Sequence, residues 1–221
     1  MCNEIMGRNL SVGTAALWVA GYFGVMLLYT FLDVAVWRKL APEASGWLDL
    51  VSTAACAVGF LLLLQRRYPI RWTEGINISG LMLALVCAAG FYLVLDMGLD
   101  PLLAKAFPGS ENQYQEAVRS LLRFPVPAFL KVCIIAPAVE EALMRGFLLD
   151  GLRSGYGTAA ALLISAVVFA LLHFNAVQTL SALVCGLVLG LLYLHTGSIF
   201  CCILAHFGYN AVSYFVMLAK S

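Results

Sequence analysis

Apolar runs of about 20 residues recur along most of the chain, and they limit its possible folds more than any other feature. A helix of about 20 residues crosses the roughly 30 Å hydrocarbon core of a bilayer. Of the 221 residues, 62% are hydrophobic and only 11% are charged, whereas soluble domains have about 25% charged residues. The sequence therefore predicts an all-α, polytopic bundle of about seven transmembrane helices. Their expected limits are residues 10–36, 47–65, 78–99, 125–150, 158–175, 179–195 and 198–218.

The longest polar interruption lies at residues 100–124 and separates two groups of runs. We predict N-terminal transmembrane helices plus an amphipathic connector at residues 1–124, and a helical core at residues 125–221, within one membrane domain. In the interruption, Ser110 is a suitable N-cap, and apolar side chains follow it at helical spacing. Two interpretations remain open for this segment, which are an amphipathic helix on the membrane surface and an exposed connector.

Charge and cysteine content exclude several classes of protein. The formal net charge is +1, which gives no electrostatic case for binding nucleic acid. Lys and Arg do not gather on one side of the predicted membrane, so they do not predict the orientation. Six of the seven cysteines lie in apolar runs without C-x-x-C spacing, which favours small hydrophobic residues over a disulfide framework. They are Cys56, Cys87, Cys133, Cys185, Cys201 and Cys202.

Some polar residues in the apolar runs need no special explanation. Asp33, Asp96 and Lys131 lie close enough to the ends of their runs for interfacial placement or snorkelling. His195 directly precedes a T-G-S turn between the last two predicted helices and is interpreted as a structural residue at the interface. We assign no function to these four residues from the sequence.

Glu140, Glu141 and Arg145 lie about ten, nine and five residues from the nearest end of the fourth run. Insertion scales assign about 2.5–3.5 kcal/mol to an Asp, Lys or Arg at the membrane centre. Glu141 and Arg145 are four residues apart, so an ion pair can offset part of this cost. Glu140 lies about 100° around the helix from Glu141 and must face another helix or a water-filled cavity.

Two other predicted helices contribute polar residues at similar depth. The fifth run places Phe169 and His173 one turn apart, and the last run places His206 and Asn210 at the same spacing. At 1.5 Å per residue, Glu140, His206 and His173 lie roughly 15, 12 and 22 Å below the same membrane surface. The sequence therefore predicts one intramembrane cavity shared by Glu140, His173, His206 and Asn210.

These residue types allow hydrolysis of an amide. Glu140 can take a proton from water and later return it, while His206 and Asn210 can donate hydrogen bonds to the oxyanion of a tetrahedral intermediate. His173 can orient the water or the base. A second interpretation uses the same atoms as metal ligands, since Glu140, His173 and His206 could bind zinc and leave a position for water. The sequence does not choose between them.

Three ordered motifs resemble those of a known family. "EEALMR" matches E-E-x-x-x-R, "FALLH" matches F-x-x-x-H and "HFGYN" matches H-x-x-x-N. Together they resemble the motifs of the CPBP family, the CAAX prenyl endopeptidase and bacteriocin-processing group also called Abi proteins, over about residues 125–215. The resemblance implies a glutamate-dependent intramembrane endopeptidase. It makes Glu140, His173, His206 and Asn210 catalytic, with Glu141, Arg145 and Phe169 in supporting positions and no cofactor required.

The resemblance also implies a substrate class and a location. We expect cleavage near the C-terminal end of a membrane-associated peptide or protein, either prenylated or carrying a C-terminal sorting tail. The enzyme is then a multi-pass protein of a bacterial or archaeal cell membrane. Two other hypotheses remain, namely a non-catalytic immunity or scaffolding protein with the same fold, and a small transporter with a proton relay. The internal repeat expected of such a transporter is not evident.

Overall fold

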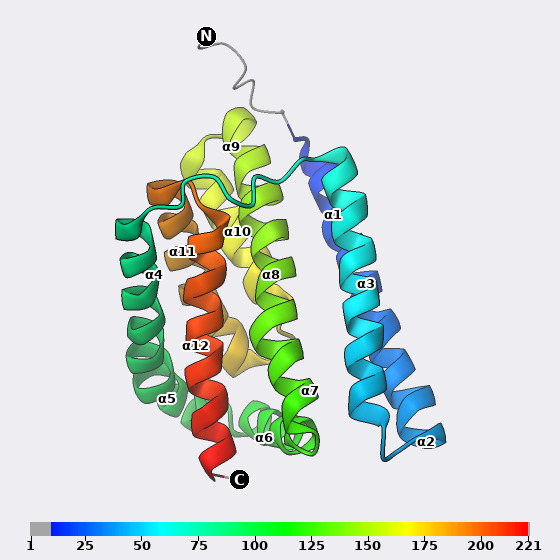
Figure 1. Ribbon diagram of the computed structural model, residues 1–221. Coiled ribbons are helices and arrows are strands. Elements are labelled where there is room, and N and C mark those ends of the chain that lie inside the picture. The colour runs from blue at the N-terminus through cyan, green and yellow to red at the C-terminus, as the bar shows by residue number, and fades with distance from the viewer. Residues whose placement is uncertain (1–9, 221) are drawn as a thin grey trace.

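The computed structural model describes residues 10–220, and within this range the regular structure is entirely helical (Figure 1). The predicted all-α fold is therefore confirmed. Two long helices come first, joined by a short turn, and form a hairpin at one side of the molecule. They consist of α1 (Val12–Phe31), η1 (Leu32–Trp37) and α2 (Arg38–Leu40), which are continuous, and of α3 (Ser45–Arg67).

A third long helix and a short one follow the hairpin. The long helix consists of α4 (Ile78–Phe91), the π-helical η2 (Tyr92–Leu99) and α5 (Asp100–Ala106), and the short one is α6 (Pro108–Leu122). The segment expected to be either an amphipathic helix or a connector is thus a helix, and it lies across one end of the bundle (Figure 1). Our N-cap prediction is wrong, because α6 begins two residues before Ser110. Pro108 stands in its first turn, where the fixed φ of proline suits a helix start.

One continuous helix, residues 125–156, contains the E-E-x-x-x-R motif. It alternates α-helical and π-helical geometry as α7 (Pro125–Phe129), η3 (Leu130–Ile135), α8 (Ala136–Glu141), η4 (Ala142–Leu149) and α9 (Asp150–Tyr156). In Figure 1 its middle part, α8, stands between α12 and the α1–α3 hairpin. The packing of the helices agrees with this placement. The hairpin helix α3 packs on η3, and α12 packs on both η3 and α8. Glu140 and Glu141 therefore lie at the centre of the bundle.

The last three helices complete the core around helix 125–156. They are α10 (Thr158–Leu171), α11 (Ala176–Thr196) and α12 (Ile199–Lys220). The turn between α11 and α12 needs Gly197, whose φ of 65° is favourable only for glycine. This tight turn makes α11 and α12 antiparallel neighbours, so that the H-x-x-x-N motif runs down beside the glutamates.

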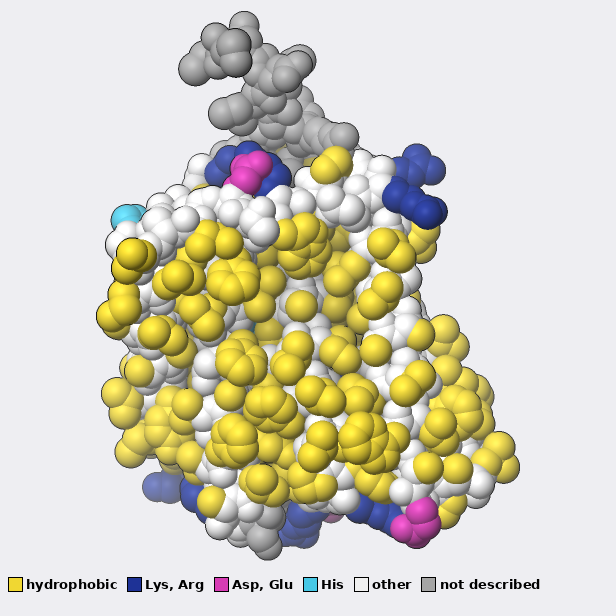
Figure 2. Space-filling model, viewed as in Figure 1, with side chains coloured by type: hydrophobic (Ala, Val, Ile, Leu, Met, Phe, Trp, Pro, Cys, Tyr) yellow, Lys and Arg dark blue, Asp and Glu magenta, His cyan; other side chains and the backbone are white. Residues whose placement is uncertain are grey.

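The surface of the bundle agrees with a position in a bilayer. Hydrophobic side chains cover the middle of the face shown in Figure 2, and Lys, Arg, Asp and Glu lie at its two ends. Five helices in the described range are long and apolar enough to cross a membrane, while Thr158–Leu171 is shorter. The number seven stays a prediction, since helix 125–156 has several charged residues. The five are Val12–Leu40, Ser45–Arg67, Ile78–Ala106, Ala176–Thr196 and Ile199–Lys220.

Candidate active site

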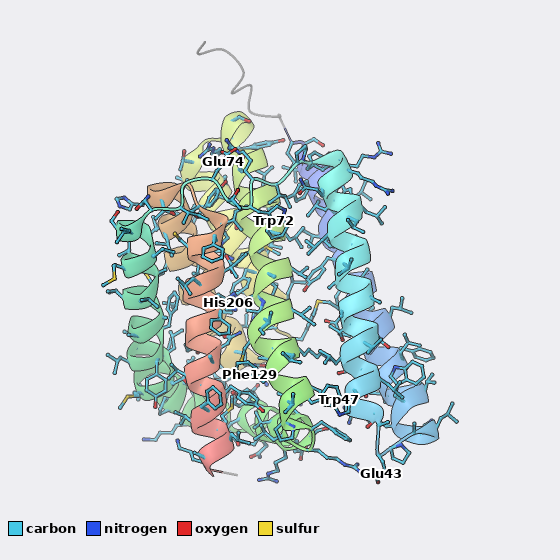
Figure 3. The ribbon with its side chains drawn as sticks, viewed as in Figure 1. Glu43, Trp47, Trp72, Glu74, Phe129 and His206 are labelled. Carbon is cyan, nitrogen blue, oxygen red and sulfur yellow. The ribbon has the colours of Figure 1, made fainter. Side chains whose placement is uncertain are left out.

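His206 lies midway along α12 and faces both adjacent glutamates of helix 125–156 (Figure 3). Its Nδ1 atom is 2.9 Å from Oε1 of Glu141, and its Nε2 atom is 3.9 Å from Oε2 of Glu140. A carboxylate can only accept a hydrogen bond, so Nδ1 of His206 carries the hydrogen and donates it to Glu141. The other ring nitrogen, Nε2, is directed toward Glu140. The structure thus brings the first and third motifs together.

Glu141 and Arg145 form the ion pair that their spacing predicts. Nη1 of Arg145 is 3.1 and 3.0 Å from the two carboxylate oxygens, and both side chains are fully buried. Nη2 of Arg145 also donates to the backbone carbonyl of Gly186 on α11 at 2.9 Å. The guanidinium lies 5.0 Å from the ring centre of Phe169 on α10. Arg145 therefore joins three helices and compensates the buried charge of Glu141.

Glu140 has different surroundings from its neighbour. Its side chain is 18% exposed, and it lines a small cavity between helix 125–156 and the α1–α3 hairpin. Tyr22 and Tyr29 of α1 and Thr53 of α3 line the same cavity. Glu140 therefore has space beside its carboxylate, whereas Glu141 has none. The part played by the N-terminal helices was missed by the sequence analysis, because single tyrosines and threonines in apolar helices give no signal.

His173 lies just beyond the last residue of α10, and its ring is half-buried. Its Nδ1 atom is 3.0 Å from the carbonyl oxygen of Phe169, so Nδ1 carries the hydrogen and Nε2 is left as an acceptor. The Phe169 ring stands edge-on to both His173 and His206, with centroid distances of 5.1 and 5.7 Å. Phe169 thus separates the two histidines and sets their spacing. Among the described residues no hydrogen bond or ion pair joins His173 to Glu140.

Asn210 makes a contact that the sequence analysis did not foresee. Its Nδ2 atom donates to the carbonyl oxygen of Val132 in η3 at 3.0 Å. With the i→i+5 bonding of a π-helix, this carbonyl would accept from residue 137, which is proline and has no N–H. Asn210 therefore supplies the missing donor, as neighbouring helices often do for prolines in membranes. Pro137 was the sequence feature from which this contact could have been expected, because a proline leaves a carbonyl of the preceding turn without its N–H donor.

Comparison with known proteins gives one match, to residues 122–212. The matching family model is described as Type II CAAX prenyl endopeptidase Rce1-like. This segment belongs to that family. It contains all three motifs and begins just before helix 125–156, which agrees with the CPBP resemblance of the sequence. No curated protein and no solved structure matches the chain.

The match over residues 122–212 supports, at family level, a CAAX-type protease, a hydrolase, and the apolar helices support an integral membrane protein. The match does not extend to the α1–α3 hairpin, which supplies the far wall of the cavity at Glu140. The division into residues 1–124 and 125–221 stays a prediction.

The zinc interpretation requires Glu140, His173 and His206 to converge on one point. Among the residues described, no group of three or more His, Cys, Asp or Glu is arranged to hold a metal ion. Nδ1 of each histidine is bonded to Glu141 or to a backbone carbonyl, which leaves Nε2 of both histidines as the possible ligand atom, so it is the separation of the three side chains that disfavours zinc. In the present arrangement these three side chains do not converge as zinc ligands.

Proposed function

We propose that this protein is an intramembrane endopeptidase that hydrolyses a peptide bond near the C-terminal end of a membrane-associated substrate, with water activated by Glu140. The observation that supports the proposal is the contrast between the two adjacent glutamates. Glu141 is fully buried and compensated by Arg145, while Glu140 is partly exposed to a cavity and lies 3.9 Å from Nε2 of His206. Only Glu140 is free to meet water and a substrate.

Charge balance supports a shared proton at this site. The charges of Glu141 and Arg145 cancel, so the site is neutral when one proton resides on either Glu140 or His206. Neutrality matters because an uncompensated charge at this depth is costly. In the reactive form the proton is on His206, so that Glu140 is a carboxylate and Nε2 of His206 is a donor.

Hydrolysis then follows from these positions. Glu140 takes a proton from water, and the water oxygen attacks the scissile carbonyl carbon. The oxyanion that forms accepts a hydrogen bond from Nε2 of His206 and one from the amide hydrogen of Asn210 that is not bonded to Val132. Glu140 returns its proton to the amide nitrogen as the C–N bond breaks, which leaves a carboxylic acid and an amine. The acid then passes its proton to the amine, so the products are a carboxylate and an ammonium group. Nε2 of His173 accepts the second hydrogen of the attacking water and orients it.

The substrate is proposed as a membrane-associated peptide or protein that is either prenylated or carries a C-terminal sorting tail. The purified protein in lipid is tested with a fluorogenic library of C-terminal membrane-tail peptides, and products are identified by mass. Glu140→Gln should lower the cleavage rate by about 10²–10⁴-fold, His173→Ala should also lower it, and a chelator should leave the wild-type rate unchanged. His195→Ala is the matched control, because His195 is exposed at the end of α11.

The outcomes separate the competing hypotheses. Cleavage that survives in Glu140→Gln would refute the mechanism, and cleavage lost on chelation would favour zinc. If the wild-type protein cleaves no peptide and its cellular function persists in Glu140→Gln, the non-catalytic immunity or scaffolding role would replace the proposal.

A further inference from the structure

Lys131 lies between the cavity at Glu140 and a second cavity at one end of the bundle. Its side chain lines both cavities and is 24% exposed. The second cavity opens at the end marked by Glu43 and Trp47 in Figure 3, where its lining residues Arg38 and Arg123 are 51% and 59% exposed. Lys131 is therefore the residue that the linings of the two cavities share.

The π-helical segment η3 turns Lys131 toward the cavity at Glu140. In a regular α-helix, residues nine positions apart differ by about 180° in direction, so Lys131 would point away from the cavity at Glu140. A single π turn accommodates one extra residue and changes this angle by roughly 100°. Because η3 begins at residue 130, the change falls between Lys131 and Glu140. Snorkelling alone, our interpretation from the sequence, does not account for a lysine that lines the cavity at Glu140.

The surroundings of Lys131 are suited to a carboxylate. Its Nζ atom is 2.7 Å from Oδ2 of Asp49 and 5.0 Å from the ring centre of Tyr29. An ammonium group has three donors, and Asp49 takes one of them. The second cavity is lined by three cations and two carboxylates, and the third cation, Arg123, pairs at 3.7 Å with Glu43, an exposed side chain outside the lining. The charged lining residues are Arg38, Arg123 and Lys131, with Asp33 and Asp49.

We propose that Lys131 binds the free C-terminal carboxylate of the substrate, which rests on the peptidase function proposed above. The nine-residue separation of Lys131 and Glu140 corresponds to about 13 Å along the helix. An extended peptide rises about 3.3 Å per residue, so three or four residues fit between the scissile bond and the carboxylate. The ion pair with Lys131 thus selects substrates with a free C-terminus and sets the length of the released peptide.

The test compares two peptides that differ only at the C-terminus. Each has a hydrophobic anchor and the same short tail, ending either in a free carboxylate or in an amide. In lipid nanodiscs, the wild-type protein should cleave the acid with a kcat/KM about 10- to 100-fold above that of the amide, as expected for one charge-assisted hydrogen bond. Binding of both peptides to Glu140→Gln should show a similar preference.

Lys131→Met should bring the acid-to-amide ratio close to one. Because this change leaves Asp49 without its partner, Asp49→Asn/Lys131→Met provides a second variant with neither charge. Lys105→Met is the matched control, since Lys105 is exposed on α5 and lines neither cavity, and it should keep the wild-type ratio.

The result separates this inference from the proposed function. Equal cleavage of the acid and amide by the wild-type protein, or an unchanged ratio in both Lys131 variants, would overturn the role of Lys131 and leave the peptidase intact. If the wild-type protein cleaves neither peptide and Glu140→Gln binds neither, both proposals fall.

Discussion

Replacing Arg145 with methionine tests how the bundle tolerates charge at its centre. The change removes the partner of Glu141, the donor to the Gly186 carbonyl and the cation over Phe169, all in a fully buried position. Breaking a buried ion pair by removing one partner costs about 3–5 kcal/mol. The unpaired carbonyl and the lost cation–π contact are part of the same loss and are not added to it. For a chain of this size, such a loss lowers the unfolding midpoint by about 6–20 °C.

The assay measures unfolding of the purified protein in mixed micelles, with heat in one series and with increasing denaturing detergent in a second. Glu141→Gln/Arg145→Met should recover part of the stability, because no uncompensated charge remains. Arg153→Met is the control on the same helix. Arg153 pairs with Asp150 at 3.1 Å, but both side chains are partly exposed, so the loss should stay below about 1 kcal/mol. Equal losses in Arg145→Met and Arg153→Met, or a double variant no more stable than Arg145→Met, would refute the reasoning.

Three further predictions concern the packing and the site. Asn210→Ala leaves the Val132 carbonyl unpaired and should cost about 1–3 kcal/mol in the same unfolding assay; an unchanged midpoint would contradict that bond. Gly75→Ala should destabilise the protein more than Gly157→Ala. Both have positive φ, but only at Gly75 would the added Cβ lie 2.5 Å from a backbone oxygen, that of Thr196. A larger loss in Gly157→Ala would contradict this comparison. Prolonged dialysis against a chelator should leave the unfolding midpoint unchanged, and a fall would indicate a structural metal.

Much of the fold and part of the site follow from local spacing in the sequence. The apolar runs are long enough to predict the five long apolar helices from length alone. The four-residue spacing of Glu141 and Arg145 predicts their ion pair, and the depth of His206 predicts its approach to Glu140. These features could be predicted because they depend on the rise and turn of a single helix, together with the short turn that makes its neighbour antiparallel.

Other features depend on contacts that a single sequence does not encode locally. The bond from Asn210 to Val132 requires the register between two helices, and the tyrosines that line the cavity come from a distant hairpin. The direction of Lys131 depends on the π-helical segment η3 before Pro137. Regular α-helical spacing would place this lysine on the side of the helix that faces away from the cavity at Glu140. The predicted N-cap at Ser110 failed because Pro108 begins the helix one turn sooner. The catalytic roles of the site residues stay proposals.

The most direct test of the account is the rate of peptide-bond hydrolysis by Glu140→Gln relative to the wild-type protein, measured in lipid with one cleaved membrane-tail peptide. The unfolding midpoints of the two proteins are compared first, so that loss of fold is not mistaken for loss of chemistry. Removal of a general base should lower the rate by about 10²–10⁴-fold while the midpoint stays close to that of the wild type. Equal rates in two folded proteins would contradict the assignment of Glu140 as the residue that activates water.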